Sequence, residues 1–279
     1  MKSPRLGPSE RAVLDTALSF AEKLADDLRP WLLDRSGRQQ AETKADGSLV
    51  SEADVMADER ITAAIGARFR DHEVVSEERD TCFHGATWCW VVDPIDGTTN
   101  FVHGIPYWGV SIALAYEGQP VLGLVEAPAL DARYRVLASE GAVAGLRAFA
   151  DGDGLRVRDV DWSEPGQVQN ALLGLSSPLG RCYVLDTPVK PRVMGCESLH
   201  LASVAEGAMV ATMVAGAQVW DVAAGALLVL EAGGVVIEVS EEPPFPMRPG
   251  EDQAGRDHHI VAAASERTAR KVIAALQRG

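Results

Sequence analysis

The sequence predicts a layered α/β fold in which helices and strands are interspersed along the whole chain. Segments with apolar residues at helical spacing alternate with short runs of β-branched and aromatic residues. The intervals between these runs include hairpin-like and crossover-like lengths, which favours packed sheets and helices over a helical bundle or a sandwich. The chain has 279 residues, enough to bury a large core, and shows no clear linker, internal repeat or low-complexity tract.

The helical segments are recognised by their apolar spacing and by the residues at their ends. In the first, Ser9 to Leu33, Pro8 is a start signal and Ser9 a candidate cap. A stop at Gly233-Gly234 is expected after one of the later segments. The later helices are predicted at Ser51 to Phe69, Glu197 to Ala205, Trp220 to Ala232 and Glu266 to Gln277.

The strands are predicted where β-branched and aromatic residues form short runs bounded by turn residues. They are Glu73 to Ser76, Trp88 to Val92, Val110 to Tyr116, Val121 to Glu126, Asn170 to Leu175, Val235 to Val239 and Ile260 to Ala263. Gly37 to Ser48 is polar and rich in turn residues, so we expect a loop there. Asp151 to Gln167 is acidic and contains glycines, which predicts a surface connection. We therefore expect one domain over 1–279, with subdomains of roughly 1–150 and 151–279.

The composition indicates a soluble enzyme rather than a nucleic-acid or membrane-binding protein. The formal net charge is −14, from 40 acidic and 26 basic side chains, which disfavours nonspecific binding to nucleic acid or to anionic membrane. No apolar stretch is long enough for a signal or membrane segment. The cysteines lack Cys-x-x-Cys pairing, so we expect reduced thiols in a cytoplasmic protein. They are Cys82, Cys89, Cys182 and Cys196.

The segment from Trp90 to Phe101 carries the strongest chemical signal. Asp93 falls at the end of a predicted buried strand, and Pro94 disfavours further ladder bonding. The turn that follows can start a helix, with Asp96 or Thr98 as its cap. Two carboxylates, a hydroxyl and helix-start amides then face one point, which suits Mg²⁺ and a phosphate. A lone Asp-x-x-Asp would more simply be a capped turn.

Acidic residues also stand at the ends of three other predicted elements. They are Asp54, the pair Glu77-Glu78, and Asp221 after Trp220. Taken singly, Asp54 and Asp221 are explained as helix-start charges and Glu77-Glu78 as a solvated pair. Their order and spacing are more specific than any one of them.

Together these motifs resemble the inositol monophosphatase superfamily of Mg²⁺-dependent, lithium-sensitive phosphomonoesterases. The signature of that family is Asp, Glu-Glu, Asp-Pro-Ile-Asp-Gly-Thr and Trp-Asp-x-x-Ala, which this chain supplies as Asp54, Glu77-Glu78, Asp93 to Thr98 and Trp220 to Ala224. The resemblance covers essentially residues 10 to 278. It implies a five-layer α/β/α/β/α sandwich, like that of fructose-1,6-bisphosphatase, and commonly a homodimer.

The resemblance also implies the site residues. Glu77, Asp93 and the Ile95 carbonyl would hold one Mg²⁺, and Asp93, Asp96 and Asp221 a second, with a third, weaker ion near Glu77. Thr98, oriented by Asp54, and Glu77 would take the proton of the attacking water. Lys44 would lie on a mobile loop, either as a lid cation or as an exposed lysine. The residues expected to meet the substrate are Asp96, Gly97, Thr98, Thr99, Gly195, Glu197 and Asp221.

The substrate pocket departs from the pattern of inositol-specific members. These carry a glutamate seven residues before the Trp-Asp aspartate, where this chain has Val214. The pocket segment reads Gly195-Cys196-Glu197, and Glu197 is either a helix-start charge or a pocket carboxylate that favours a polyol or an ammonium group. His103 and His200 have no partners at metal-ligand spacing and are interpreted as structural or surface residues.

The predicted function is Mg²⁺-dependent, Li⁺-inhibited hydrolysis of a small-metabolite phosphate monoester. An inositol-1-phosphate-like polyol phosphate is the first expectation. Histidinol phosphate, 3′-phosphoadenosine 5′-phosphate and fructose-1,6-bisphosphate are the enzymatic alternatives. A metal-binding regulatory protein without turnover is the alternative of another class.

Overall fold

Two mixed sheets organise the molecule. The computed structural model describes residues 6–43, 49–138, 141–146, 154–177, 179, 183–239 and 243–278. The first sheet has the strand order β3-β5-β6-β7-β8-β9, in which only the β3–β5 pair is parallel. Its strands are β3 (Glu73–Ser76), β5 (Trp88–Asp96), β6 (Gly109–Tyr116), β7 (Gln119–Ala127), β8 (Ala132–Leu137) and β9 (Gly141–Leu146).

The second sheet has the order β12-β10-β13-β16-β14. Its β12, β10 and β13 are parallel, and β16 runs antiparallel to both β13 and β14. The strands are β10 (Leu172–Leu175), β12 (Lys190–Arg192), β13 (Ala211–Ala217), β14 (Val235–Glu238) and β16 (His258–Ala263).

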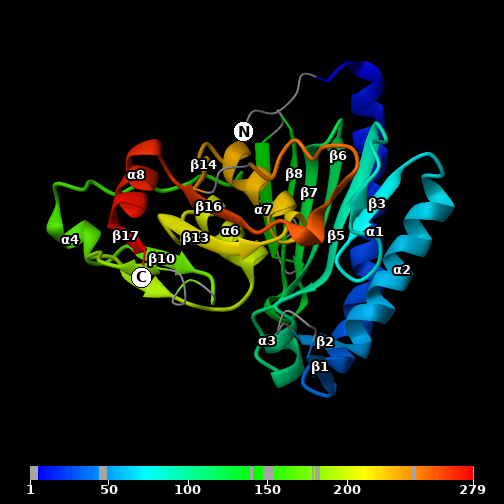
Figure 1. Ribbon diagram of the computed structural model, residues 1–279, viewed down its shortest axis with the longest axis horizontal. Coiled ribbons are helices and arrows are strands. Elements are labelled where there is room, and N and C mark those ends of the chain that lie inside the picture. Colours follow the sequence, from blue (N-terminus) through cyan, green and yellow to red (C-terminus); the bar gives the residue numbers. More distant parts are fainter. Residues whose placement is uncertain are drawn as a thin grey trace.

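The helices form three layers around these sheets (Figure 1). Helices α1 (Pro8–Arg35) and α2 (Glu52–Arg68) share a core with one face of the first sheet. Helices α6 (Glu197–Ala205) and α7 (Val219–Glu231) lie between the two sheets. Helices α8 (Glu266–Ala275) and α4 (Pro165–Val168) cover the outer face of the second sheet. The predicted five-layer α/β/α/β/α sandwich is therefore confirmed.

The composition of α7 explains its central place. Its only charged residues are Asp221 in the first turn and Glu231 at the end, and the residues between them are apolar on every side. A helix that is apolar all round can be stable only where it is covered all round. The same packing brings Asp221 to the border between the two halves of the molecule.

Several short strands, a short helix and 3₁₀ turns complete the fold. They are β1 (Ala41–Thr43) paired with β2 (Leu49–Ser51), β4 (Cys82–Phe83) with β15 (Glu251–Asp252), β11 (Tyr183–Leu185) with β17 (Leu276–Arg278), helix α3 (Thr98–His103), and the 3₁₀ turns η1 (Pro128–Leu130) and η2 (Gln253–Gly255).

The structure confirms the predicted bounds of β3 and α6 and corrects others. The first helix is capped by Gly7 rather than Ser9, with Pro8 in its first turn. The segment predicted as a loop from Gly37 to Ser48 contains β1. The closing helix ends at Ala275, because the next three residues pair with β11. Strands β8, β9, β12 and β13 have no counterpart among the predicted elements.

Candidate active site

The site is built on the last residues of β5, which continues beyond the predicted end at Val92. Asp93 lies opposite Ser111 and Asp96 opposite Gly109, so two residues of β5, Pro94 and Ile95, face a single residue of β6. Such a bulge accommodates a proline, which has no N–H for the ladder. Both aspartates are buried, with exposed fractions of 1% and 6%.

Gly97 makes the turn from β5 into α3. Its φ is +87°, and a Cβ there would lie 2.9 Å from the Gly195 carbonyl oxygen. Only glycine suits both the conformation and the close approach. The predicted cap by Asp96 or Thr98 is wrong, because Gly97 is the N-cap and no side chain caps the helix. The Thr98 hydroxyl lies instead 3.0 Å from Asp54 Oδ1 and 3.1 Å from the Ile95 carbonyl oxygen.

Asp54 reaches this turn from the start of α2. Its Oδ2 accepts hydrogen bonds from the Ser51 backbone N–H at 2.8 Å and from the Ser51 hydroxyl at 2.6 Å. This half of a capping box fixes the carboxylate at the helix start. The other oxygen, Oδ1, is the one that faces Thr98.

Glu77 and Asp221 come from two further elements, the end of β3 and the start of α7. Glu77 follows β3, and its backbone N–H donates to the Val92 carbonyl at 3.3 Å, which places it beside the strand residue before Asp93. Asp221 stands in the first turn of α7, where its Oδ2 accepts from the Gln218 N–H at 2.7 Å.

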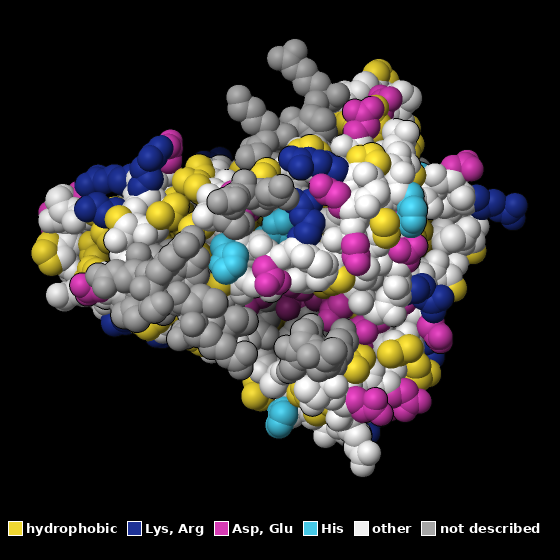
Figure 2. Space-filling model, viewed as in Figure 1, with side chains coloured by type: hydrophobic (Ala, Val, Ile, Leu, Met, Phe, Trp, Pro, Cys, Tyr) yellow, Lys and Arg dark blue, Asp and Glu magenta, His cyan; other side chains and the backbone are white. Residues whose placement is uncertain are grey.

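These side chains converge electrostatically. Burial raises the pKa of Asp93 well above its usual range, and four further carboxylates add to the effect: Glu77, Asp96, Asp221 and Asp54. Burial likewise raises the pKa of Asp221, reinforced by Asp96 and Glu77. Like charges this close in a buried place disfavour the ionised state unless cations offset them. Figure 2 shows acidic side chains in a hollow near the middle of the face it presents.

Carboxylates of this site accept hydrogen bonds from nearby amides and hydroxyls. Among the residues that the structure describes, no three His, Cys, Asp or Glu side chains form a preformed metal site. The donor set nevertheless suits a hard cation. Each carboxylate offers about four lone-pair positions, so one or two N–H bonds leave room for a metal. Three donors meet the two oxygens of Asp54, and three others meet those of Asp96.

Those three donors come from the N-terminus of α6. The Glu197 and Ser198 N–H groups donate to Asp96 at 3.1 and 2.6 Å, and the Cys196 thiol lies 3.1 Å from Asp96 Oδ2. A carboxylate at a helix N-terminus is favoured by the free amides and the helix dipole. This contact joins the two halves of the chain. Cys196 was predicted only as part of the pocket segment and Ser198 had no predicted role, since nothing local indicates a partner about 100 residues away.

Glu197 also belongs to this neighbourhood. Its Oε2 lies 3.3 Å from Nδ1 of His200, and its side chain is 15% exposed. Burial raises the pKa of Glu197, while the hydrogen bond from His200 lowers it. Asp96 and Asp221 both interact with it electrostatically. Glu197 thus lies at a helix start, as one alternative predicts, and beside Asp96, while its role as a pocket carboxylate stays a prediction. His200, predicted to be structural or at the surface, is fully buried.

Asn100 is a residue that the sequence-based site missed. Its Nδ2 donates to the carbonyl oxygens of Tyr107 at 2.7 Å and Met194 at 2.6 Å. These bonds tie α3 to the loop that carries Gly195. Asn100 is 8% exposed, and its position directly after the Asp-Gly-Thr-Thr turn is the sequence signal that could have found it.

The other predicted residues lie as follows. Thr99 is exposed on α3, where its carbonyl oxygen is 2.8 Å from Nδ1 of the exposed His103. Val214 is fully buried in β13, opposite Ile260. Lys44 lies outside the described residues.

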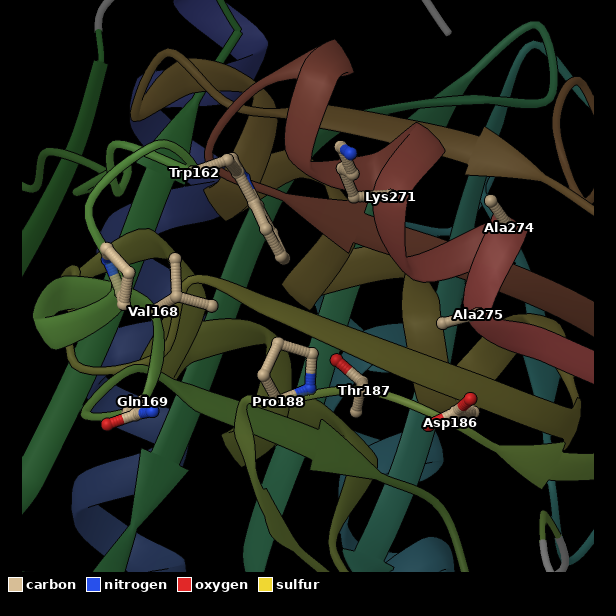
Figure 3. Close-up of a pocket in the computed structure, with 10 residues that line it drawn as sticks. Trp162, Val168, Gln169, Asp186, Thr187, Pro188, Lys271, Ala274 and Ala275 are labelled. Atoms are coloured by element: carbon tan, nitrogen blue, oxygen red, sulfur yellow. The ribbon is translucent and has the colours of Figure 1, made fainter.

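A cavity of about 480 Å³ lies elsewhere, between α4, α8 and the segment after β11. Figure 3 shows the Trp162 ring reaching toward Pro188 from one side, with Ala274 and Ala275 of α8 on the other. No predicted site residue lines it.

Comparison with known proteins gives the family. The inositol monophosphatase family model matches residues 10–279. An inositol-1-monophosphatase of Mesorhizobium japonicum is 32% identical over 251 residues, or 86% of each chain. A histidinol-phosphatase of Mycobacterium tuberculosis is 36% identical over 204 residues, covering 69% of this chain and 75% of the relative. The solved IMPase of Thermotoga maritima superposes with a TM-score of 0.72 at 26% identity, over 93% of this chain and 97% of that one.

No helix within the described ranges is both long and apolar enough to cross a bilayer. The family match covers nearly the whole chain, and the named relatives hydrolyse phosphate esters by name. Enzymes of this family are generally metal-dependent, which agrees with the convergence of buried carboxylates at the end of β5. The chain therefore belongs to the inositol monophosphatase family and is a phosphoric monoester hydrolase.

Proposed function

We propose that this enzyme hydrolyses a small-metabolite phosphate monoester with two to three Mg²⁺ ions. The observation that carries the proposal is the convergence of four other carboxylates on Asp93, next to the Thr98–Asp54 contact. In the proposed ligand set, Glu77, Asp93 and the Ile95 carbonyl would hold one ion, and Asp93, Asp96 and Asp221 would hold another. Glu77 would also contribute to a third, weaker site.

When bound, the ions supply charge neutralisation of the phosphate dianion and of the leaving alkoxide and lower the pKa of the attacking water. The protein side chains orient the attacking water and accept its proton. Thr98 donates its hydroxyl hydrogen to Asp54, which leaves its oxygen lone pairs free to accept a hydrogen bond from the water. Glu77 is the other proposed acceptor of the proton.

The phosphate is held by the turn itself. The first amides of α3 have no acceptor within the helix, so Gly97 and Thr98 N–H groups are available to phosphate oxygens. Because Gly97 approaches Gly195 closely, the loop after Met194 forms the neighbouring wall. Attack by water needs no covalent phospho-enzyme.

The substrate of first choice is an inositol-1-phosphate-like polyol phosphate. Histidinol phosphate is the second candidate, and Glu197 is the observation that favours it. At the place where inositol-specific members carry a glutamate, the buried Val214 cannot accept a hydroxyl hydrogen bond. Glu197 adds a carboxylate beside Asp96 and Asp221, which favours a leaving group that carries hydrogen-bond donors or an ammonium group.

The test is phosphate release from a substrate panel, with and without Mg²⁺ and with added Li⁺. The panel holds inositol-1-phosphate, histidinol phosphate, fructose-1,6-bisphosphate and 3′-phosphoadenosine 5′-phosphate. We expect Mg²⁺-dependent, Li⁺-inhibited release that is strongest on one compound. Metal binding without release on any compound would instead support a regulatory protein without turnover.

The variant Glu197→Gln sharpens the choice of substrate. It keeps the shape of the side chain and removes its charge, so KM for histidinol phosphate should rise more than KM for inositol-1-phosphate. Equal changes in the two KM values would mean that Glu197 does not determine specificity.

We further propose that the enzyme works in the cytoplasm as a homodimer, the assembly that is common in the family. Light scattering of the purified enzyme tests whether it is a dimer.

A further inference from the structure

Helix α2 carries two buried aspartates one turn apart. Asp54 and Asp58 are each 1% exposed. Side chains four residues apart lie on the same face of a helix, so both carboxylates point into the molecule along one line. Asp54 contacts Thr98. Asp58 has no place in the proposed reaction, yet it contacts the other catalytic turn.

That second turn carries Glu77 and Glu78, and Asp58 binds the residues on both sides of this pair. The Ser76 hydroxyl donates to Asp58 Oδ1, and Arg79 Nε donates to Asp58 Oδ2 at 3.0 Å. The turn is closed further by the Ser76 N–H, which donates to the Asp80 carbonyl at 2.9 Å. One carboxylate therefore holds both ends of the four-residue segment from Ser76 to Arg79.

Burial and a charged partner strengthen the contact between Asp58 and this turn. Asp58 is buried, and its bond to Arg79 involves a guanidinium, which makes it stronger than a neutral hydrogen bond. Arg79 comes from the solvent side, with its side chain 52% exposed. The Glu77 N–H is bonded in turn to β5 at Val92. Glu77 is thus fixed between α2 and the strand that carries Asp93.

We propose that Asp58 is a positioning residue that holds Glu77 at the proper distance for cation binding. Helix α2 then sets the spacing between the two halves of the site, with Asp54 placing Thr98 and Asp58 placing Glu77. This inference rests on the proposed function, in which Glu77 is a metal ligand. Mg²⁺ requires near-octahedral geometry with short bonds, so a displaced ligand weakens binding.

The test compares Asp58→Asn, Ser76→Ala and the matched control Glu59→Gln. Glu59 lies next to Asp58 on α2 and pairs with Arg79 at 3.7 Å, but its side chain is 61% exposed. Mn²⁺ binding to the substrate-free protein is measured by electron paramagnetic resonance. The Mg²⁺ concentration for half-maximal phosphate release and the kcat at saturating Mg²⁺ are measured separately.

We expect Asp58→Asn and Ser76→Ala to weaken Mn²⁺ binding and raise the half-saturating Mg²⁺ concentration by about 10-fold, the lower end of the range for direct partners of metal ligands, because Asp58 bonds Ser76 and Arg79 rather than Glu77 itself. Their kcat at saturating Mg²⁺ should fall less than the metal affinity does, because Glu77 is also a proposed proton acceptor but the Thr98–Asp54 pair is untouched. Glu59→Gln should leave all three quantities unchanged, since an exposed ion pair contributes little.

Several results would overturn the inference. They are unchanged Mn²⁺ binding in folded Asp58→Asn, a loss of kcat without a change in metal affinity, and an equal loss of metal affinity in Glu59→Gln. If Asp58→Asn fails to fold by circular dichroism, Ser76→Ala decides by the same criteria. A wild-type protein that binds no Mn²⁺ and releases no phosphate would instead contradict the proposed function.

Discussion

Two charge clusters in this enzyme, each around a buried carboxylate, have opposite surroundings. Glu126 of β7, with its side chain 1% exposed, lies 3.0 Å from Arg29 Nη1 and 2.5 Å from Arg133 Nε. Asp93 of β5 is just as buried, but its charged neighbours are carboxylates. A buried charge is tolerated when it is paired and hydrogen-bonded. The charges of the first cluster are paired within the chain, whereas we propose that cations from solution complete the second.

The largest effect is expected from Asp93→Asn. The amide carries no charge to hold the proposed cations, so phosphate release at saturating Mg²⁺ should fall more than about 100-fold, beyond the usual cost of losing an outer partner. The same change removes a buried like charge, so the metal-free protein should unfold at a higher urea concentration than the wild type.

Activity assays and urea unfolding measure both effects, with the exposed Asp71→Asn as a control. Near-normal turnover by Asp93→Asn in Mg²⁺ would contradict the proposed site.

The next effect concerns Thr98, which joins the acidic cluster to Asp54. Thr98→Val removes the hydroxyl but keeps the shape, so kcat should fall by about 100-fold, the size typical of a lost proton-transfer group. Mn²⁺ affinity should change little, because the hydroxyl is not a proposed metal ligand. Thr98→Ser should recover most of the lost rate. A kcat that survives in Thr98→Val would remove this residue from the reaction.

The complementary substitution in the paired cluster is Glu126→Gln. It leaves the two arginines without their shared anion, and we expect the free energy of unfolding to fall by about 2–4 kcal/mol. Phosphatase activity of the folded protein should be unchanged. Asp131→Asn is the matched control, since Asp131 pairs with Arg29 but is 48% exposed and should cost under about 1 kcal/mol. Equal losses of unfolding free energy in Glu126→Gln and Asp131→Asn would mean that the buried and the exposed ion pair contribute equally to stability.

The smallest effect is a pH dependence. Burial, with neighbouring carboxylates, raises the pKa of Asp93 and of Asp221 in the folded chain. In the unfolded chain aspartates titrate near pH 3.9. Above that pH the folded state keeps more protons at these two sites, so their contribution makes the unfolding free energy fall as pH rises toward the folded pKa values.

Urea unfolding of the metal-free protein between pH 4 and pH 8 measures this slope. Asp93→Asn should have a shallower slope than the wild type, by at most about 1.4 kcal/mol per pH unit. Identical slopes would mean that Asp93 is ionised over the whole range without a bound cation.

Local signals were enough for many elements of the fold. Strand β3 and helix α6 have their predicted bounds, since β-branched residues and a helix-start charge mark their ends. The continuation of β5 through Pro94 was missed because the bulge depends on the partner strand β6. Strand β13 was missed because an apolar run such as Ala208 to Val214 has no clear period.

For the site, the motifs carried more information than the secondary structure. The Asp-Pro-Ile-Asp-Gly-Thr block, with Asp54, Glu77 and Asp221, was sufficient to indicate the family. The contacts of Asp96 with α6 and of Asp58 with Ser76 and Arg79 join residues distant in sequence, so no local pattern contains them. The choice of substrate depends on the same long-range packing, around Glu197 and Val214.

The most direct test of the difference between the two clusters is thermal unfolding of the wild type, Asp93→Asn and Glu126→Gln, each with and without Mg²⁺. Ligand that binds only the folded state raises the unfolding midpoint. We expect Mg²⁺ to raise the Tm of the wild type and of Glu126→Gln by similar amounts and to leave Asp93→Asn nearly unchanged. A wild-type Tm that does not respond to Mg²⁺, or an equal rise in Asp93→Asn, would contradict the account of the acidic cluster as a cation site.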